Sequence, residues 1–411
     1  MKLRSAILLL AVVLALVPAN GLLPRDTPAS NVLPYRYGLL SWEVRTLSAK
    51  AVQALGGQLF PPKPMAGDVE PVKRYFALAV RQQEVLRDLE RAAAARADTS
   101  GIEEELAGLR KEQAALEDRV EAIIAAQVKE AVGSEGLFRG PRRNILFPPV
   151  LLELDPLPDL LVLSPRARIE IEDTSLVSPG LSVSTQEHLE RQQEKLGRSS
   201  LVTGIGGLAT YPSLVSATSG LRFALGAVAH EWLHHYLAFQ PLGRQYGANG
   251  DLTSLNETVA ELFGDEIGAR LYHEFYGGPP PPPLDRRQEP GDRPDPGQFD
   301  FTREMRQTRV RAEELLREGL IYEAESYMEE RRQLFLANGY YLRKLNQAYF
   351  AFHGSYAESP ASVSPLGAQV RSLRLSSASL GDFVRTVERF SRFEDFVARA
   401  TSLGDSASTR P

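Results

Sequence analysis

The stretch AHEWLHHY (residues 229–236) decides how the rest of the sequence is interpreted. It holds three of the six histidines in a chain of 411 residues. On a helix, His230 and His234 lie one turn apart on the same face, so both imidazoles can reach one metal ion. Glu231 lies beside them, where a carboxylate can take the proton of a metal-bound water. The residues around the motif are uncharged, as in a buried helix, and two histidines and a glutamate in such a helix need a bound partner. The alternative is a surface helix that carries the histidines by chance.

A catalytic zinc site requires a third protein ligand besides the two histidines. Because the chain contains no cysteine, the remaining candidates are His, Asp and Glu. A second helix is expected from residue 253 or 254 to about residue 275, and NETVAE (residues 256–261) lies near its start. Its stripe of acidic and then small residues would let it approach the first helix and direct Glu257 and Glu261 at the histidines. Asp251 is a competing third ligand, and a solvated acidic face is the other interpretation.

The HExxH motif followed by NExxx(D/E) on a second helix resembles the gluzincin zinc metallopeptidases, the thermolysin-like group. The resemblance implies one Zn²⁺ ion per chain, bound by His230, His234 and Glu257. Glu231 would then be the general base, and Glu261 the carboxylate that orients a ligand histidine. The resemblance covers the two central helices, not the helices nearer to either terminus.

The same resemblance implies an edge strand that pairs with the substrate backbone, and a Tyr or His that stabilises the oxyanion. In chain order, the place of that strand is taken by four residues, Gly206, Gly207, Leu208 and Ala209. An ordinary core strand is the alternative. The candidates for oxyanion stabilisation are His353 and Tyr356, which belong to an aromatic segment with a glycine turn. A packed aromatic helix end would account for the same residues.

Composition excludes several other classes of protein. Hydrophobic residues make up 43% of the chain and charged residues 24%, which is typical of globular proteins and excludes a wholly disordered chain. The formal net charge of −5 argues against a nucleic-acid partner, because phosphate binding requires an excess of basic residues. The absence of cysteine excludes disulfide scaffolds, thiolate zinc sites and cysteine nucleophiles.

The N-terminal residues 1–23 predict a signal peptide or a membrane anchor. Lys2 and Arg4 precede a run of apolar residues at positions 6–17, and small residues allow cleavage after Ala19. An uncleaved anchor that continues through Leu23 is the alternative. Both interpretations place the protein outside the cytoplasm, either secreted or anchored to the membrane by this helix.

The remaining pattern predicts a mainly α protein with a small β-sheet (α+β), in which a zincin-like catalytic core is flanked by an N-terminal helical hairpin and C-terminal helices. A turn at residues 98–101 favours an antiparallel hairpin, with a dimerising coiled coil as the alternative. The alternating residues 168–172 predict a strand. The predicted regions are an N-terminal helical region (24–136), a catalytic domain (137–276), a Pro-rich linker or loop (277–298), a C-terminal helical subdomain (299–403) and a tail (404–411).

We therefore expect an extracytoplasmic zinc metallopeptidase that hydrolyses peptide bonds with a metal-activated water. Its partner would be a peptide or protein substrate, with membrane association through the N-terminus and no nucleic acid. One alternative is a catalytically inactive zincin-like scaffold for protein–protein assembly at the membrane surface; another is a zinc hydrolase of non-peptide amides. The presence of Glu231 argues against the scaffold, because a structural zinc needs no base beside it.

Overall fold

The computed structural model of the protein describes residues 32–39, 41–43, 45–46, 66–94, 97–137, 146–218, 220–282, 299–354, 361 and 364–408. Residues 1–23, the predicted signal peptide or membrane anchor, lie outside this part of the chain. Of the proline-rich stretch, only residues 277–282 are described. Within the described ranges, no helix combines the length and the apolar character that crossing a membrane requires.

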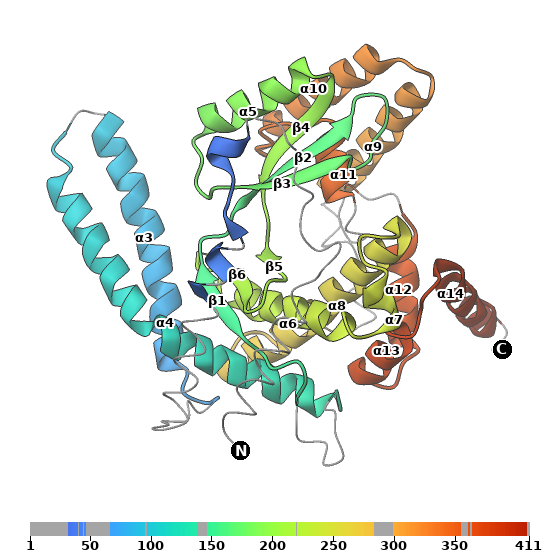
Figure 1. Ribbon diagram of the computed structural model, residues 1–411, viewed down its shortest axis with the longest axis horizontal. Helices are drawn as coiled ribbons and strands as arrows, with labels where there is room; N and C mark the ends of the chain where they lie inside the picture. The colour runs from blue at the N-terminus through green and yellow to red at the C-terminus, as the bar shows by residue number, and fades with distance from the viewer. Residues whose placement is uncertain are drawn as a thin grey trace.

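Two helices, α6 (Leu221–Leu237) and α8 (Gly250–Tyr276), form the centre of the fold (Figure 1). Both carry apolar residues on most of their faces, and both are therefore largely buried. The Asn249 side chain caps the start of α8 by accepting a backbone hydrogen bond, and Gly277 ends the helix in the left-handed conformation, with φ at 69°. The short helix α7 (Pro241–Arg244) turns the chain between them.

The backbones of α6 and α8 touch each other. A Cβ atom on Gly264 would lie 2.7 Å from the carbonyl oxygen of Gly226, and one on Gly268 would lie 2.7 Å from the Gly226 Cα. Side chains do not fit at such distances, so the contact requires glycine at both positions of α8. Next to this contact, the rings of Trp232 and Phe263 stack with their centroids 6.1 Å apart. The close approach fixes which side chains of the two helices face each other.

Two small sheets lie above the helix pair in the view of Figure 1. In the first, the strand order is β1 (Leu152–Asp155), β6 (Ser213–Ser216) and β5 (Gly207–Leu208). In the second, which is antiparallel, the order is β3 (Asp173–Val177), β2 (Asp159–Pro165) and β4 (Arg198–Gly204), and α5 (Val183–Lys195) packs on β4. The mainly helical structure with small sheets confirms the predicted α+β class.

The prediction of a strand at residues 168–172 is wrong. The β2–β3 hairpin pairs Leu163 with Asp173, so residues 168–172 lie in the loop between these strands. Ile169 packs against apolar residues of the helices that follow the proline-rich stretch instead of joining a sheet. The alternation of apolar and polar residues here reflects packing against helices.

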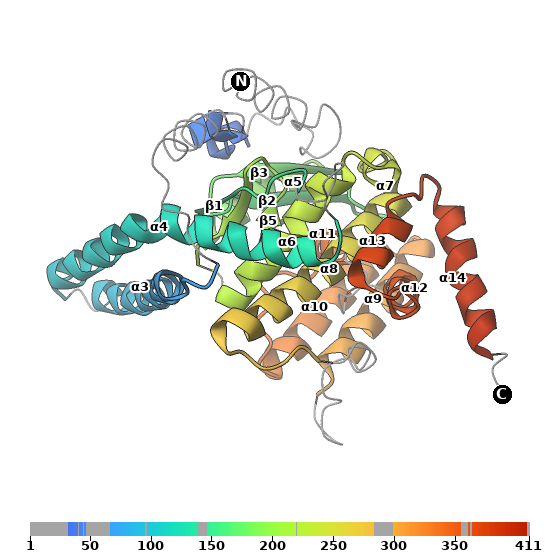
Figure 2. The same ribbon diagram turned by 90° about the horizontal axis from the view of Figure 1, so that it is seen from below.

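Helices α3 (Glu70–Ala94) and α4 (Ser100–Ser134) form an antiparallel hairpin that projects from the body (Figure 2). Ion pairs link Arg74 to Glu112 and Arg81 to Glu105, so residue numbers rise along one helix as they fall along the other. The second half of α4 carries the buried residues Val120, Ile123, Ile124 and Val128, and it packs against β1, α6 and α8. The hairpin is thus joined to the body through α4.

The C-terminal helices divide between two places in the fold. One group consists of α9 (Phe301–Arg317), α10 (Ile321–Ala337) and α11 (Gln347–His353). In this group α9 and α10 pack on each other, and α11 packs on β2 and β4. The other group packs on or near α8: α12 (Leu366–Leu375), α13 (Leu380–Val387) and α14 (Phe393–Ser408). The sequence predicts one C-terminal subdomain with a tail from residue 404, but α14 continues to Ser408.

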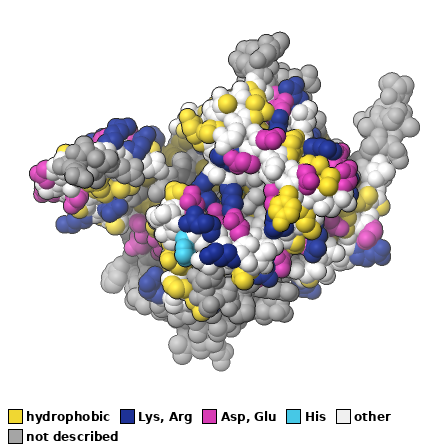
Figure 3. All heavy atoms as spheres, turned by 90° about the horizontal axis from the view of Figure 1, so that it is seen from above, with side chains coloured by type: hydrophobic (Ala, Val, Ile, Leu, Met, Phe, Trp, Pro, Cys, Tyr) yellow, Lys and Arg dark blue, Asp and Glu magenta, His cyan; other side chains and the backbone are white. Residues whose placement is uncertain are grey.

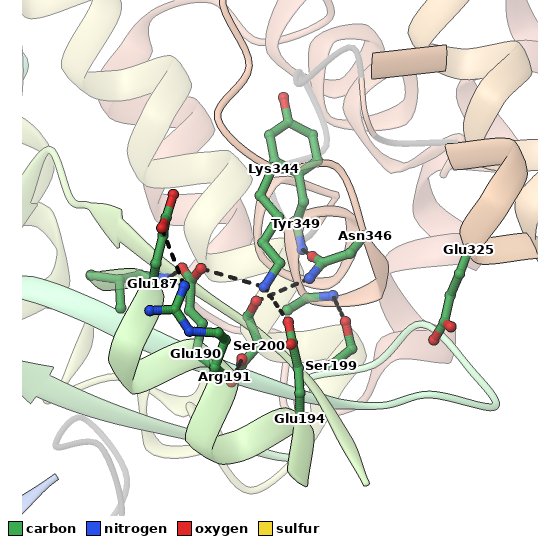
Figure 4. A network of polar contacts seen from close by, with 12 residues as sticks. Glu187, Glu190, Arg191, Glu194, Ser199, Ser200, Glu325, Lys344, Asn346 and Tyr349 are labelled. Carbon is green, nitrogen blue, oxygen red and sulfur yellow. Dashed lines mark hydrogen bonds and ion pairs between the residues drawn. The ribbon is translucent and has the colours of Figure 1, made fainter. Parts of the chain in front are cut away.

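A buried carboxylate holds the segment before α11 onto the second sheet (Figure 4). The Glu190 side chain on α5 is 2% exposed, and both of its oxygens accept hydrogen bonds from Arg343, at 2.5 and 2.9 Å. Lys344 and the Val202 N–H donate to the same carboxylate, at 3.3 and 2.6 Å. Burial alone would raise the pKa of Glu190, but these partners lower it overall. Asn346 then caps α11 by accepting a hydrogen bond from a backbone N–H.

We predict that Arg343→Met lowers the free energy of unfolding by about 3 kcal/mol at pH 7, because it leaves a buried carboxylate poorly paired. Urea titration measures this loss. Since the pKa of Glu190 is lowered by folding, its stabilisation is present above the unfolded value of about 4.3 and disappears as the pH falls through the folded value. Arg191→Met, which removes an exposed pair with Glu187, should cost at most about 0.5 kcal/mol. Equal losses in the two variants would contradict this assignment.

Candidate metal centre

Three donor atoms from α6 and α8 converge on one point. The Nε2 atoms of His230 and His234 lie 3.0 Å apart, and Oε2 of Glu257 lies 3.6 Å from each of them. Zinc binds imidazole nitrogen and carboxylate oxygen at about 2.0–2.2 Å, so two donors of a tetrahedral ion lie roughly 3.3–3.6 Å apart. The three observed separations bracket this range. Two histidines and a glutamate are also a donor set that zinc accepts, so the residues fit the ion.

The hydrogen bonding of His234 directs a lone pair at this point. Its Nδ1 lies 2.9 Å from Oδ1 of Asn256, and an amide oxygen can only accept, so Nδ1 carries the hydrogen. The Nε2 atom of a neutral His234 is then unprotonated and faces Nε2 of His230. Two facing imidazole nitrogens at 3.0 Å require a proton or a cation between them. The role of Asn256 was missed at the sequence level, although it directly precedes the predicted ligand.

Tyr246 is a second residue that sequence reasoning missed. Its hydroxyl donates a hydrogen bond to Oε1 of Glu257, and its ring packs edge-on against His234, with the centroids 5.7 Å apart. It lies in the loop between α7 and α8, where no local periodicity marks it. Tyr246 therefore holds the carboxylate oxygen that does not face the histidines.

The charges of the centre favour one cation among the three donors. Burial would raise the pKa of Glu257, but the two histidines lower it well below its ordinary value. Burial would lower the pKa of His230, but the surrounding carboxylates, chiefly Glu257, raise it to about 9. Glu261 is one of those carboxylates, which places its charge near His230. A metal ion bound here would replace the proton that these groups otherwise hold.

Glu231 lies between the donors and strand β5. One of its carboxylate oxygens is within 4.8 Å of the donor atoms of both histidines. On its other side, a Cβ atom on Gly207 would overlap Oε1 of Glu231, so glycine is required for this contact. Burial raises the pKa of Glu231, and the histidine charges offset this only in part. A raised pKa makes a carboxylate a stronger proton acceptor.

The centre opens into a cleft of about 1080 Å³ between the helix pair and the sheets. The cleft is lined by all four residues predicted to bind substrate, Gly206, Gly207, Leu208 and Ala209. Of these, Gly207 and Leu208 form β5, which is the edge strand of its sheet. The lining also includes the three candidate metal donors, and in addition Glu231, Glu261 and Tyr246. Backbone of an edge strand, a carboxylate and the donor atoms therefore share one space.

Other predicted residues lie elsewhere. His353 packs on Tyr349 at the end of α11, with the ring centroids 4.3 Å apart, and it is Phe352, not His353, that lines the cleft. Tyr356 lies outside the described residues. Asp251, the competing ligand, is exposed in the first turn of α8. His235 is buried against Tyr211, and burial lowers its pKa to about 4.

Comparison with protein-family models, with curated proteins and with solved structures finds no match to this chain. The geometry of the centre therefore has to support its chemistry alone.

We predict that Gly264→Ala weakens metal binding. The added methyl group would lie 2.7 Å from the Gly226 carbonyl oxygen and 3.0 Å from Cβ of His230, so α6 and α8 must separate. Overpacking of this kind costs about 1–3 kcal/mol, and the shift moves Glu257 away from the histidines. Zinc affinity is measured by competition with a chromophoric chelator, and stability by thermal unfolding.

The matched control is Gly108→Ala in α4, where nothing lies within 4 Å of the added methyl group. It should leave zinc affinity unchanged and raise helix stability by up to about 1 kcal/mol. Unchanged zinc affinity in Gly264→Ala would show that the donor spacing does not depend on the glycine contact.

Proposed function

We propose that this protein is a zinc-dependent metallopeptidase of the gluzincin type that acts outside the cytoplasm. The observation that carries the proposal is the separation of the three donor atoms, 3.0, 3.6 and 3.6 Å, with Glu231 beside them. The order of an edge strand, a histidine-bearing helix and a glutamate-bearing helix (β5, α6, α8) supports a zincin-like core. The N-terminal sequence supports the compartment.

The residues of the chain have separable tasks in peptide hydrolysis. His230, His234 and Glu257 would hold the zinc ion, which when bound supplies a Lewis acid and lowers the pKa of water. Glu231 takes the proton of the attacking water at its carboxylate and passes it to the leaving amine. Burial raises the pKa of Glu231, which makes its carboxylate easier to protonate.

The substrate backbone would pair with β5. An extended peptide can add to an edge strand through backbone hydrogen bonds, and β5 is an edge of its sheet. Because Gly207 contacts Glu231, a peptide on this edge lies next to the carboxylate. Tyr246 lines the same cleft and fixes Glu257, so it is better placed than His353 to act near the scissile bond.

We predict that the wild-type protein binds one zinc ion, that Glu257→Ala loses it, and that Glu231→Gln keeps it. Glu231→Gln should nevertheless lose peptidase activity by roughly 10²–10⁴-fold, because it cannot accept a proton. Elemental analysis gives the metal content, and cleavage of a mixed peptide pool gives the activity.

The control is Glu274→Ala, an exposed carboxylate on the same helix as Glu257, which should retain both zinc and activity. If the folded wild-type protein takes up no zinc at neutral pH, the proposal of a zinc-dependent enzyme is refuted. One zinc without cleavage of any peptide would instead favour an inactive scaffold or a hydrolase of another amide.

A further inference from the structure

The edge strand β5 is too short to fix its own position. It consists of two residues, Gly207 and Leu208, which pair with Val215 and Leu214 of β6. Strands usually run over about 3–10 residues, so this pairing is a small part of a normal ladder. The placement of β5 nevertheless matters, because Gly207 lies against Glu231. Groups outside the sheet must therefore help to hold the strand.

Helix α6 contacts the chain at and just after β5 in two places. Glu231 and His235 lie four residues apart, one turn along the same face of α6. Glu231 meets Gly207. The imidazole of His235 faces the backbone carbonyl groups of Ala209 and Thr210, which accept its hydrogen. One helical turn rises about 5.4 Å and two residues of extended chain span about 6.6 Å, so the two contacts have matching spacing.

The hydrogen bonding of His235 identifies the nitrogen that holds the chain. His235 is 5% exposed, and within the part of the chain that the structure describes its Nε2 atom meets no hydrogen-bond partner. The nitrogen that faces the two carbonyl groups is therefore Nδ1, and it carries the hydrogen, because a carbonyl oxygen can only accept. His235 thus differs from His230 and His234, whose Nε2 atoms face each other at the metal centre.

The residue that follows these carbonyl groups, Tyr211, is held in the interior by three further contacts. Its ring meets the His235 ring edge-on, with the centroids 5.3 Å apart. Its hydroxyl donates to the Pro149 carbonyl at 3.2 Å, and its backbone N–H donates to Oε1 of Glu43 at 3.4 Å. Tyr211 and Glu43 are both buried. The chain after β5 is therefore buried, and α6 reaches it through His235.

We propose that His235 is a positioning residue, which holds the chain after β5 on α6 and thereby sets the substrate-pairing edge of β5 in register with Glu231. The inference rests on the proposed peptidase function and assigns a role in it to a residue outside the HExxH motif. His235 does not line the cleft, so it acts through the strand and not on the substrate. Its loss weakens ligands that pair with β5 and spares ligands that contact only the metal centre.

The test compares the binding of two hydroxamates to the zinc-loaded full-length protein by calorimetry. Acetohydroxamic acid reaches only the metal centre, whereas the hydroxamate of alanyl-alanine also carries backbone groups that can pair with β5. His235→Phe keeps a ring but removes the N–H. It should raise the Kd of the peptidyl hydroxamate about tenfold, which corresponds to roughly one hydrogen bond. The Kd values of zinc and of acetohydroxamic acid should not change.

Two further variants separate a positioning role from general damage to the fold. His235→Asn places an amide N–H near the position of Nδ1 and should retain most of the peptidyl hydroxamate binding. The control is His188→Phe at an exposed position of α5, which should leave both hydroxamates and zinc unaffected. If His235→Phe does not fold, His235→Gln takes its place, because its amide lies one atom further from the backbone.

Amide hydrogen exchange provides a readout that requires neither zinc nor a substrate. The Thr210 N–H donates to the Leu208 carbonyl at 2.7 Å, and the residues of β5 pair with β6. Peptides that contain residues 207–211 should exchange roughly tenfold faster in His235→Phe than in wild type, because the strand is held less firmly.

Unchanged binding of the peptidyl hydroxamate in His235→Phe, or an equal loss of both hydroxamates, overturns the positioning role and leaves the peptidase standing. Unchanged exchange at residues 207–211 overturns it as well. Absence of zinc-dependent cleavage by the wild-type protein overturns the peptidase itself, and with it this inference.

Discussion

The backbone contact between α6 and α8 is the constraint on which the rest of the structure depends. Glycine at positions 226, 264 and 268 lets the two helices approach without intervening side chains. At this distance a carboxylate about two turns into α8 reaches the histidines of α6, and Glu257 lies 3.6 Å from both. Larger residues would separate the helices and leave one buried and two partly buried polar side chains, His234, His230 and Glu257, without their mutual partners.

The remaining elements complete this centre from outside. The second half of α4 covers the helix pair on one side, and the sheets close the other side, where β5 places Gly207 against Glu231. The Glu190–Arg343 pair fixes the segment that leads into α11, and α11 in turn contributes Phe352 to the cleft. Distant parts of the chain are therefore needed to shape the space in front of the donor atoms.

Part of the candidate site could be predicted from the local sequence pattern. The spacing of His230 and His234 on one helix face depends only on helical periodicity, and so it could be predicted from the sequence. The position of Tyr246 could not, because a loop between two helices brings it to Glu257. His353 shows the opposite error: its aromatic neighbourhood indicated a site, but α11 packs so that this ring meets Tyr349 and not the cleft. The prediction of a strand at residues 168–172 was wrong because Ile169 packs against helices and Ile171 lines the cleft.

The measurement that tests the central claim most directly is zinc K-edge X-ray absorption of the zinc-loaded protein in solution. Two imidazoles and carboxylate oxygen should surround the ion at about 2.0–2.2 Å, in four- or five-fold coordination. The claim predicts that this signal loses an imidazole contribution in His234→Ala. A shell of oxygen atoms alone, or a spectrum that the substitution does not alter, would contradict a zinc site between α6 and α8.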